Sequence, residues 1–408
     1  MYTIYLQVFC ICIQFTYEVK MLKKRYLQSF IEEDLAEKMV FLGGPRQVGK
    51  TTLATEVIGH NRRSQYYNWD KKDQRIQALE GKWMPDQKLI ILDEFHKYRK
   101  WKTWIKGEYD VWKEKYQFLL TGSARLNVYR RGGDSLQGRY HYYRLHPFSV
   151  SELEYKIPKL KPGDEPLFHD SKVGHFDDLF RFGGFPDPLF KQNERFLRRW
   201  HNERVEKIIE EDIRDLTLVQ DIGNLTLLAE LLLERTSSIC SVNSLAQDLG
   251  VNYRTAENWL NIFEELFYCF RLDPFFSKKI AAVRKEKKLY LWDWSQVKDP
   301  SERIENIVAS HLLKFCHYLK DVEGWKTSLY YLRDHTGREV DFLVTCDLRP
   351  WFAVEVKNKD HRVSSALYYF QEKLKIPYCY QVIHHFSKDY LENNVRIMPL
   401  SKFLSALV

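Results

Sequence analysis

Short apolar runs alternate with helical patterns through the first third of the chain. Residues 38–43, 88–92 and 116–120 (KMVFLG, KLIIL and YQFLL) are continuous and of strand length, which is typical of strands buried on both faces of a sheet. Residues 52–58 (TLATEVI), after the first run, have helical spacing instead. Strands that alternate with helices predict an α/β fold with a parallel sheet.

Two later segments have the alternation of half-buried strands. Residues 338–344 (REVDFLV) and 351–357 (WFAVEVK) alternate apolar and polar positions. Because side chains repeat every two residues along a strand, Glu355 and Lys357 fall on one face of the second strand. A hairpin between the two strands would bring Asp341 alongside this pair.

The middle of the chain contains a pattern of two helices with a turn at Gly250, the form of a helix-turn-helix. The predicted buried positions are Leu245, Ala246, Leu249, Ala256, Trp259, Leu260 and Phe263. The predicted outward residues of the second helix are Tyr253, Arg254, Glu257, Asn258 and Asn261, a set that could meet bases and phosphates. A basic segment follows where a wing would lie, with Lys278, Lys279, Arg284, Lys285, Lys287 and Lys288. Contact with DNA and plain packing both remain interpretations of this region.

Chemistry enters with the loop after the first predicted strand, which reads G-x-x-x-x-G-K-T from Gly44 to Thr51. In such a P-loop the glycines let backbone N–H groups curl around phosphates at a helix N-terminus. Lys50 would neutralise the β- and γ-phosphates, and the Thr51 hydroxyl would hold Mg²⁺. The predicted ATP site consists of Gly44, Pro45, Arg46, Gln47, Val48, Gly49, Lys50, Thr51 and Thr52.

The next two predicted strands end in residues that suit phosphoryl transfer. Asp93 and Glu94 follow residues 88–92, and we expect Asp93 to bind Mg²⁺ and Glu94 to orient or deprotonate the attacking water. Ser123, or else Thr121, follows the next strand as a candidate γ-phosphate sensor. Arg139 is a candidate arginine finger, in cis or from a neighbouring subunit. Arg125, Arg130 and Arg131 fit a solvated loop face better.

These motifs together carry a family resemblance. The series GPRQVGKTT, LIILDE, LLTGSA, SLQGRYHYYRLHPFSVSELE and RFGGFPDP resembles prokaryotic AAA-like ATPases with a C-terminal restriction-endonuclease-like domain. The resemblance implies a P-loop sheet with a helical lid, a winged-helix segment and a C-terminal α/β nuclease-like fold. The domains then expected are a leader at 1–20, an ATPase core at 21–165, a lid-like region at 166–235, a winged helix-turn-helix at 236–288 and a restriction-endonuclease-like domain at 289–408.

The C-terminal strands fit the D…E-x-K pattern of restriction-endonuclease-like nucleases. Asp341 and Glu355 would bind Mg²⁺, and Lys357 would orient the water or stabilise charge at the phosphate. Glu305, in a predicted helix, resembles the additional carboxylate of that fold. Ordinary surface charge on an exposed strand pair is the alternative interpretation, and the pattern does not show that DNA reaches these residues.

Composition narrows the picture only slightly. With 408 residues and 44% hydrophobic content, the chain is expected to form several globular domains. Its formal charge of +8 is compatible with a nucleic-acid partner but does not identify one. The seven cysteines form no CxxC pair or zinc-ligand cluster, so we expect reduced thiols in a cytoplasm.

The first residues carry no charge before Glu18 and then reach Met21, where an amphipathic helical pattern begins. They lack the basic region and cleavage site of a signal peptide and fall short of the roughly 20 apolar residues that a spanning helix needs. A start of translation at Met21, packing on the body and membrane contact remain three interpretations. We expect no stable membrane association.

Two functions from different classes fit the sequence. The first is an ATP-driven enzyme that acts on DNA through a winged helix and a Mg²⁺-dependent nuclease-like domain. The second is an ATP-gated regulatory or binding switch whose nuclease-like domain is catalytically silent. The sequence does not decide whether the chain forms a homo-oligomer.

Overall fold

The computed structural model describes residues 24–408, except for residue 61 and residues 124–135, 156–159, 169–173, 214–220 and 277–285. The segment before Met21, the loop arginines Arg125, Arg130 and Arg131, and most of the predicted basic wing therefore lie outside the described residues. Within the described ranges, no helix combines the length and hydrophobicity that a membrane crossing requires.

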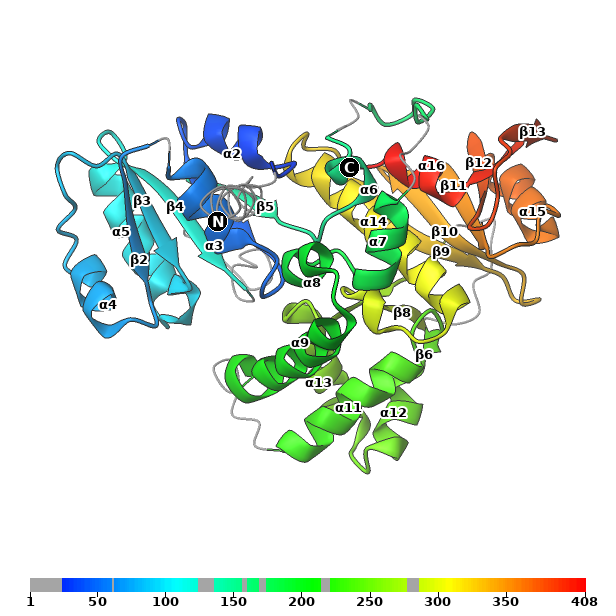
Figure 1. Cartoon of the computed structure of the whole chain (residues 1–408), viewed down its shortest axis with the longest axis horizontal. Coiled ribbons are helices and arrows are strands. Elements are labelled where there is room, and N and C mark those ends of the chain that lie inside the picture. The colour runs from blue at the N-terminus through cyan, green and yellow to red at the C-terminus, as the bar shows by residue number, and fades with distance from the viewer. Residues whose placement is uncertain are drawn as a thin grey trace, which may run out of the picture.

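A parallel sheet of five strands occupies the N-terminal part, in the order β2-β3-β4-β1-β5 (Figure 1). Its strands are β1 (Met39–Gly43), β2 (Ser64–Asn68), β3 (Leu89–Asp93), β4 (Gln117–Gly122) and β5 (Tyr140–Arg144). The predicted α/β class and parallel sheet are confirmed. Because β1, β3 and β4 run in one direction, their last residues meet at one edge of the sheet, where ligands of open α/β folds bind.

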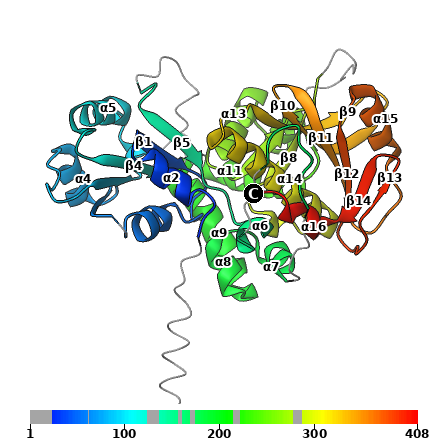
Figure 2. The same cartoon turned by 90° about the horizontal axis from the view of Figure 1, so that it is seen from above.

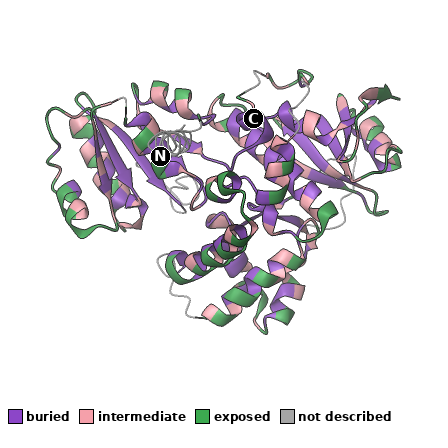
Figure 3. Ribbon diagram, viewed as in Figure 1, coloured by how far each residue is buried: buried purple, intermediate pink, exposed green. Residues whose placement is uncertain are grey.

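Alternating strand residues pack against helices on both faces of this sheet. Val40, Leu42 and Ile91 face one core with α2 (Gln28–Asp34), α3 (Lys50–Thr52) and the π-helical segment Leu53–Ile58. Phe41, Ile90 and Leu92 face the other core with α4 (Lys72–Leu79) and α5 (Trp101–Trp112). Figure 3 shows the strands as a buried layer between these helices.

Short helices lead out of the sheet into the middle of the chain. They are α6 (Val150–Leu153), α7 (His175–Phe182), α8 (Pro186–Lys191) and α9 (Glu194–Lys207), and α9 continues as the π-helical segment Ile208–Ile213. The expected helical character of residues 166–235 is therefore present wherever the structure describes regular elements there.

Residues 222–276 and 286–291 form a helix–sheet unit around a core that also includes Ile208, Ile209 and Ile213, while Phe270, Leu272 and Tyr290 of its strands belong to the core shared with α14 (Pro300–Asp321). Its elements follow the order α11 (Ile222–Glu234), β6 (Ile239–Cys240), α12 (Val242–Asp248), α13 (Tyr253–Glu265), β7 (Cys269–Leu272) and β8 (Lys287–Leu291). The three strands form an antiparallel sheet in the order β6-β8-β7. Gly250, at φ +65°, provides the left-handed turn expected between α12 and α13, and Asn252 caps α13 by accepting a hydrogen bond from Thr255 N.

A mixed sheet of six strands forms the C-terminal part, in the order β13-β14-β12-β11-β10-β9. The strands are β9 (Thr327–Arg333), β10 (Glu339–Cys346), β11 (Arg349–Lys357), β12 (Tyr378–Ile383), β13 (Tyr390–Glu392) and β14 (Val395–Pro399). The helices are α14 (Pro300–Asp321), α15 (Ser365–Leu374) and α16 (Leu400–Ser405). The predicted hairpin is β10–β11, where Phe342 pairs with Val354, so Asp341 lies opposite Glu355.

Helix α14 lies between the two large sheets. It contacts β5 of the N-terminal sheet and β8, β9, β10 and β11 on its other sides (Figures 1 and 2). Ile307, Leu312 and Phe315 of this helix belong to the same continuous core as Val40 and Phe352. The P-loop sheet and the C-terminal sheet are therefore packed on one shared helix.

Candidate functional site

The P-loop connects β1 to α3, and its lysine bonds back to the first residues of the loop. Lys50 Nζ donates to the carbonyl oxygens of Gly44 and Pro45, at 3.0 and 2.8 Å. Burial lowers the pKa of Lys50, while Glu94 and Asp93 oppose that shift. The lysine is thus held at the mouth of the loop, where a phosphate would replace the two carbonyl oxygens as its partner.

Thr51 and Asp93 meet beside this loop. Thr51 Oγ1 lies 2.9 Å from Asp93 Oδ2, and Asp93 also accepts hydrogen bonds from Thr121 Oγ1 and from the Tyr66 hydroxyl. A hydroxyl and a carboxylate at this spacing suit Mg²⁺, which is usually bound through one or two carboxylates together with substrate phosphates. The sequence predicted both residues, and the fold brings them together.

Glu94 is held in an uncommon backbone conformation. Its φ of +59° lies in the left-handed region, which a non-glycine residue adopts at a cost of roughly 1–3 kcal/mol, often at functional sites. Burial raises the pKa of Glu94 to about 7, although Lys50 opposes the shift. A carboxylate with this pKa is matched to accepting a proton from water near neutral pH.

The two sensor candidates differ in position. Thr121, inside β4, donates its hydroxyl hydrogen bond to Asp93, whereas Ser123 is buried just beyond the strand end. Ser123 is therefore the one of the two whose hydroxyl is not committed to Asp93. Its role as a γ-phosphate sensor stays a prediction.

Arg139 does not reach its own P-loop. Its carbonyl oxygen accepts from Met39 N at the amino end of β1, whereas the P-loop follows the carboxyl end. Its guanidinium lies 2.7 Å from Asp110 of α5. The expectation of an arginine finger in cis was wrong because β5 runs parallel to β1, which puts Arg139 at the opposite edge of the sheet. The alternative of a contribution to a neighbouring subunit stays a prediction.

Arg46 of the P-loop is tied to the helical region. Its guanidinium lies 2.6 Å from Glu211 and 2.7 Å from Asp212, at the end of the π-helical segment. Nothing in the local sequence pattern of this stretch marks it as part of a nucleotide site. Only the fold shows that it meets the P-loop.

A buried chain of polar contacts leads from the P-loop to α14. Arg25 donates to the carbonyl oxygen of Val48 at 2.8 Å and pairs with Glu152 at 2.6 Å. Lys314 of α14 approaches the second oxygen of Glu152, also at 2.6 Å. Nothing in the local sequence pattern distinguishes these three charged residues from surface charges, so no signal for them was present in the sequence.

The predicted residues of the C-terminal part converge at the β10–β11 hairpin. Lys357 Nζ lies 2.7 Å from Glu355 Oε1, and Asp341 Oδ2 accepts from Val356 N at 2.9 Å. The β9–β10 register shifts between Val340 and Leu343, around Asp341, as strands do next to many active sites. Burial and the neighbouring Asp341 raise the pKa of Glu355 to about 8.

Lys288 was predicted as part of an exposed basic wing, and for this residue the prediction was wrong. It is 4% exposed and lies 3.0 Å from Glu305 Oε1, 2.7 Å from Glu339 Oε1 and 3.5 Å from Asp341 Oδ1. Burial alone would lower its pKa, but Tyr290, Glu305 and the other carboxylates raise it well above the usual range. One feature of the sequence could have indicated that Lys288 is buried. Tyr290 and Trp292 follow it at every second position, so the lysine shares a strand face with two large aromatic residues.

These carboxylates do not fit a divalent metal ion as they stand. Across the described ranges no three His, Cys, Asp or Glu side chains are spaced to hold a metal. An ammonium group instead lies among Glu305, Glu339 and Asp341. The expected Mg²⁺ ligation by Asp341 and Glu355 therefore finds no preformed site in this arrangement.

The predicted outward face of α13 is only partly outward. Tyr253, Arg254 and Asn258 are exposed, but Arg271 of β7 pairs with Glu257 at 3.3 Å and bonds to Asn261 at 2.8 Å. Glu257 and Asn261 therefore face the sheet of the unit, where they accept hydrogen bonds from the buried guanidinium of Arg271.

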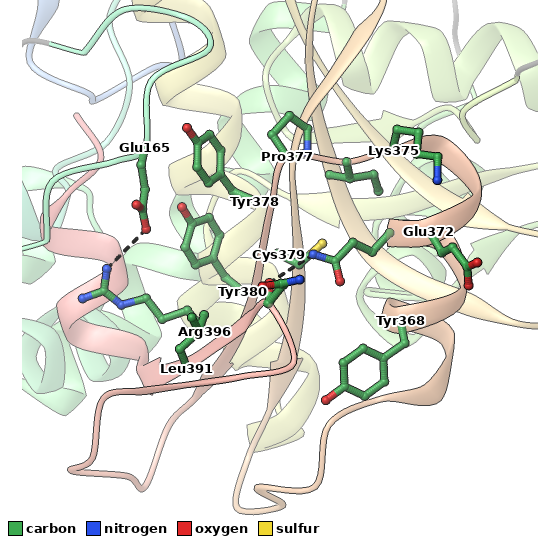
Figure 4. Close-up of a pocket in the computed structure, with 13 residues that line it drawn as sticks. Glu165, Tyr368, Glu372, Lys375, Pro377, Tyr378, Cys379, Tyr380, Leu391 and Arg396 are labelled. Carbon is green, nitrogen blue, oxygen red and sulfur yellow. Dashed lines mark hydrogen bonds and ion pairs between the residues drawn. The ribbon is translucent and has the colours of Figure 1, made fainter.

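A groove of about 740 Å³ lies elsewhere, between α15 and the amino ends of β12 and β14 (Figure 4). Tyr378 and Tyr380 line it, and an ion pair of 3.4 Å between Glu165 and Arg396 borders it. The predicted residues Glu355 and Lys357 lie at the opposite end of the parallel pair β11–β12. The groove is thus separate from the predicted sites.

Three families match successive parts of the chain. Residues 36–154 match the family described as AAA domain, and residues 173–297 and 302–403 match two families described as domains of unknown function. The first match covers the parallel sheet, the P-loop and Glu94. The N-terminal part is therefore an AAA-like P-loop ATPase domain.

Similar proteins occur in archaea and bacteria. An uncharacterized protein of Methanocaldococcus jannaschii is 21% identical over 334 residues, covering 76% of this chain and 73% of the relative. Uncharacterized proteins of Mycobacterium bovis and Mycobacterium tuberculosis are each 22% identical over 261 residues, or 62% of this chain. The match spans 54% of the length of these mycobacterial relatives.

Solved structures with partial likeness include the Walker-type ATPase of Pyrococcus abyssi, with a TM-score of 0.40 and 14% identity over 69% of this chain and 96% of that one. A RuvB variant of Thermotoga maritima has a TM-score of 0.32 and 17% identity, over 62% of this chain and 89% of that one.

Glu94→Gln is expected to lower ATP turnover by about 10²–10⁴-fold while nucleotide binding persists, because an amide cannot accept the proton of the attacking water. Turnover of the unchanged protein should fall about tenfold per pH unit below about 7, where Glu94 becomes protonated. Steady-state ATPase assays from pH 5.5 to 8.5, with fluorescent-nucleotide binding, measure both effects. Glu80→Gln, at the end of α4, is the matched control, and equal loss of turnover in both variants would contradict the assignment.

Gly44→Ala is expected to weaken ATP binding by at least about tenfold. At φ +150° an added Cβ is strained and overlaps the backbone carbonyl oxygen of Leu145, which cannot rotate away. Gly107→Ala in α5, where a Cβ meets nothing within 4 Å, should leave binding unchanged. Nucleotide titrations of the two variants decide the point, and normal affinity in Gly44→Ala would show that the loop tolerates a different path.

Proposed function

We propose that this protein is an ATP-dependent switch that acts on DNA, in which the state of the P-loop is transmitted through α14 to a nuclease-like C-terminal domain. The buried contacts from Val48 to Lys314 carry the proposal. Lys314 lies nine residues after Glu305 on one helix, a distance of about 14 Å at 1.5 Å per residue. A helix moves as a rigid rod over this length, so a shift at one residue is felt at the other.

The P-loop has two connections through which ATP would change the structure. Arg25 holds the carbonyl of Val48, and Arg46 holds Glu211 and Asp212. Phosphate groups entering the loop would compete with the acidic residues for Arg46 and would draw Lys50 away from its two carbonyl partners. We propose that Glu94 activates the water, that Thr51 and Asp93 hold Mg²⁺, and that Ser123 contacts the γ-phosphate.

The helix–sheet unit of residues 222–276 and 286–291 is the proposed DNA-binding part, in the manner of a winged helix. The order helix, strand, helix, helix, strand, strand and the exposed side chains of Tyr253, Arg254 and Asn258 support this role. The domain boundaries expected from the sequence remain part of the proposal, with residues 166–235 as a lid and residues 289–408 as the nuclease-like domain.

Arg254→Ala is expected to weaken binding to duplex DNA and to lower the slope of log affinity against log salt by about 0.9, as the loss of one phosphate contact does. Arg198→Ala, an exposed arginine of α9, serves as the charge-matched control. Fluorescence anisotropy at several salt concentrations measures both slopes. Identical slopes for the two variants would exclude α13 as the DNA-contacting helix.

Coupling is tested by the ratio of ATP turnover with duplex DNA to turnover without it. DNA is expected to change ATP turnover several-fold in the unchanged protein. Lys314→Met should bring the ratio close to one, because it removes the contact between α14 and Glu152 that completes the path to the P-loop. Removing one partner of a buried pair also costs about 3–5 kcal/mol of stability, so folding is checked by thermal unfolding. Lys320→Met, exposed on the same helix, is the control. A ratio of one in the unchanged protein would remove the proposed coupling.

DNA cleavage is the second candidate function. Glu355 favours it, since its buried Oε2 has no hydrogen-bond partner among the described residues and its Oε1 pairs with Lys357. If the site cleaves DNA, the protein should nick plasmid DNA with Mg²⁺, and Asp341→Asn should abolish the nicking. Equal nicking by both proteins would assign it to a contaminant.

A further inference from the structure

The acidic cluster at the C-terminal hairpin is assembled from three separate segments. Glu305 comes from α14, Glu339 and Asp341 come from β10, and Glu355 comes from β11. Four carboxylates gathered in one partly buried place repel one another and require compensating positive charge. Lys357 pairs with Glu355 at 2.7 Å, which leaves three carboxylates to be compensated.

Lys288 supplies this charge from outside the C-terminal sheet. It belongs to β8 of the helix–sheet unit, which packs beside α14 (Figure 1). Its ammonium group meets an oxygen of Glu305, Glu339 and Asp341 at 3.0, 2.7 and 3.5 Å. The Tyr290 hydroxyl donates to the same oxygen of Glu305 at 2.7 Å. Three carboxylates around one buried ammonium, one of them also held by a tyrosine hydroxyl, form a built cation site.

We propose that the ε-ammonium of Lys288 is the resident cation of this cluster in place of a divalent metal ion, and that the cluster binds Mg²⁺ or Mn²⁺ only when Lys288 has left it. The inference rests on the proposed function only in taking the C-terminal part as nuclease-like. A metal ion entering the cluster would have to displace a cation that is covalently part of the chain, which keeps the carboxylates unavailable as metal ligands.

The position of Lys288 also gives the cluster a regulator. β8 pairs with β7 and β6, so it belongs to the unit proposed to bind DNA. Movement of β8 relative to α14 would withdraw the ammonium from Glu305 and Asp341 together. Metal binding would then depend on the relative placement of the two units and not on the carboxylates alone.

The test measures Mn²⁺ binding to the full chain without nucleotide. Electron paramagnetic resonance detects the Mn²⁺ that stays free in solution, so the bound amount is obtained by difference. The unchanged protein and Lys287→Met are expected to show no Mn²⁺ site tighter than about 1 mM. Lys287, one residue earlier on β8, pairs with Asp273 outside the cluster and is the matched control. Lys288→Met is expected to gain a site at least tenfold tighter, and Mn²⁺ should raise its midpoint of thermal unfolding.

Two further variants keep the outcome decisive if Lys288→Met folds poorly. Lys288→Arg retains the positive charge and is expected to remain without a tight Mn²⁺ site. Lys288→Met combined with Glu305→Gln removes one charge of each sign and should lose the gained site. A tight Mn²⁺ site in the unchanged protein that Asp341→Asn removes would overturn the proposal. So would the absence of Mn²⁺ binding or of thermal rescue in Lys288→Met.

These readouts are independent of ATP turnover and of DNA affinity. If the coupling test fails but Lys288→Met gains Mn²⁺ binding, the proposal of a lysine-filled cluster stands and the proposed switch is excluded. The reverse result would retain the switch and overturn the lysine-filled cluster.

Discussion

Glu152 carries its charge in the interior of the protein because two cations meet it there, Arg25 at one oxygen and Lys314 at the other. Burial would raise the pKa of this carboxyl, but Arg25 and Lys314 lower it below its usual value. Burial in turn lowers the pKa of Lys314 to about 8, against the effect of Glu152. Such a triad adds little stability against a well-packed apolar alternative, yet removing one member leaves a buried charge without a partner.

The triad determines how the large units of the chain can be arranged. Arg25 precedes α2, Glu152 lies in α6 and Lys314 lies in α14, so one buried cluster ties three distant segments. Arg25 also holds the Val48 carbonyl, which makes the conformation of the P-loop part of the same arrangement. Apolar packing around α14 joins the two sheets without direction, whereas these ion pairs fix the orientation of the helix.

Compensating charge supplied from another unit is a recurring feature of this molecule. The P-loop receives Glu211 and Asp212 from the helical region as partners for Arg46, and the C-terminal cluster receives Lys288 from the helix–sheet unit. In both places a cluster of like or unpaired charge is neutralised by residues from another part of the chain. In the proposed function, ATP and DNA would act on these contacts with the same electrostatics, by offering a competing charge.

The sequence by itself determined the parts of the fold that depend on local order. Glycine spacing specified the P-loop, buried strand runs delivered Thr51 and Asp93 to one sheet edge, and period-two alternation placed Asp341 opposite Glu355. Tertiary structure alone decided the contacts between distant segments. It turned Arg139 away from the P-loop, because strand direction sets which edge a residue occupies, and it placed Lys288 among carboxylates and not on a wing. A lone charge in a local pattern carries no information about its partner, since that partner is set by packing between segments that are separated in the sequence.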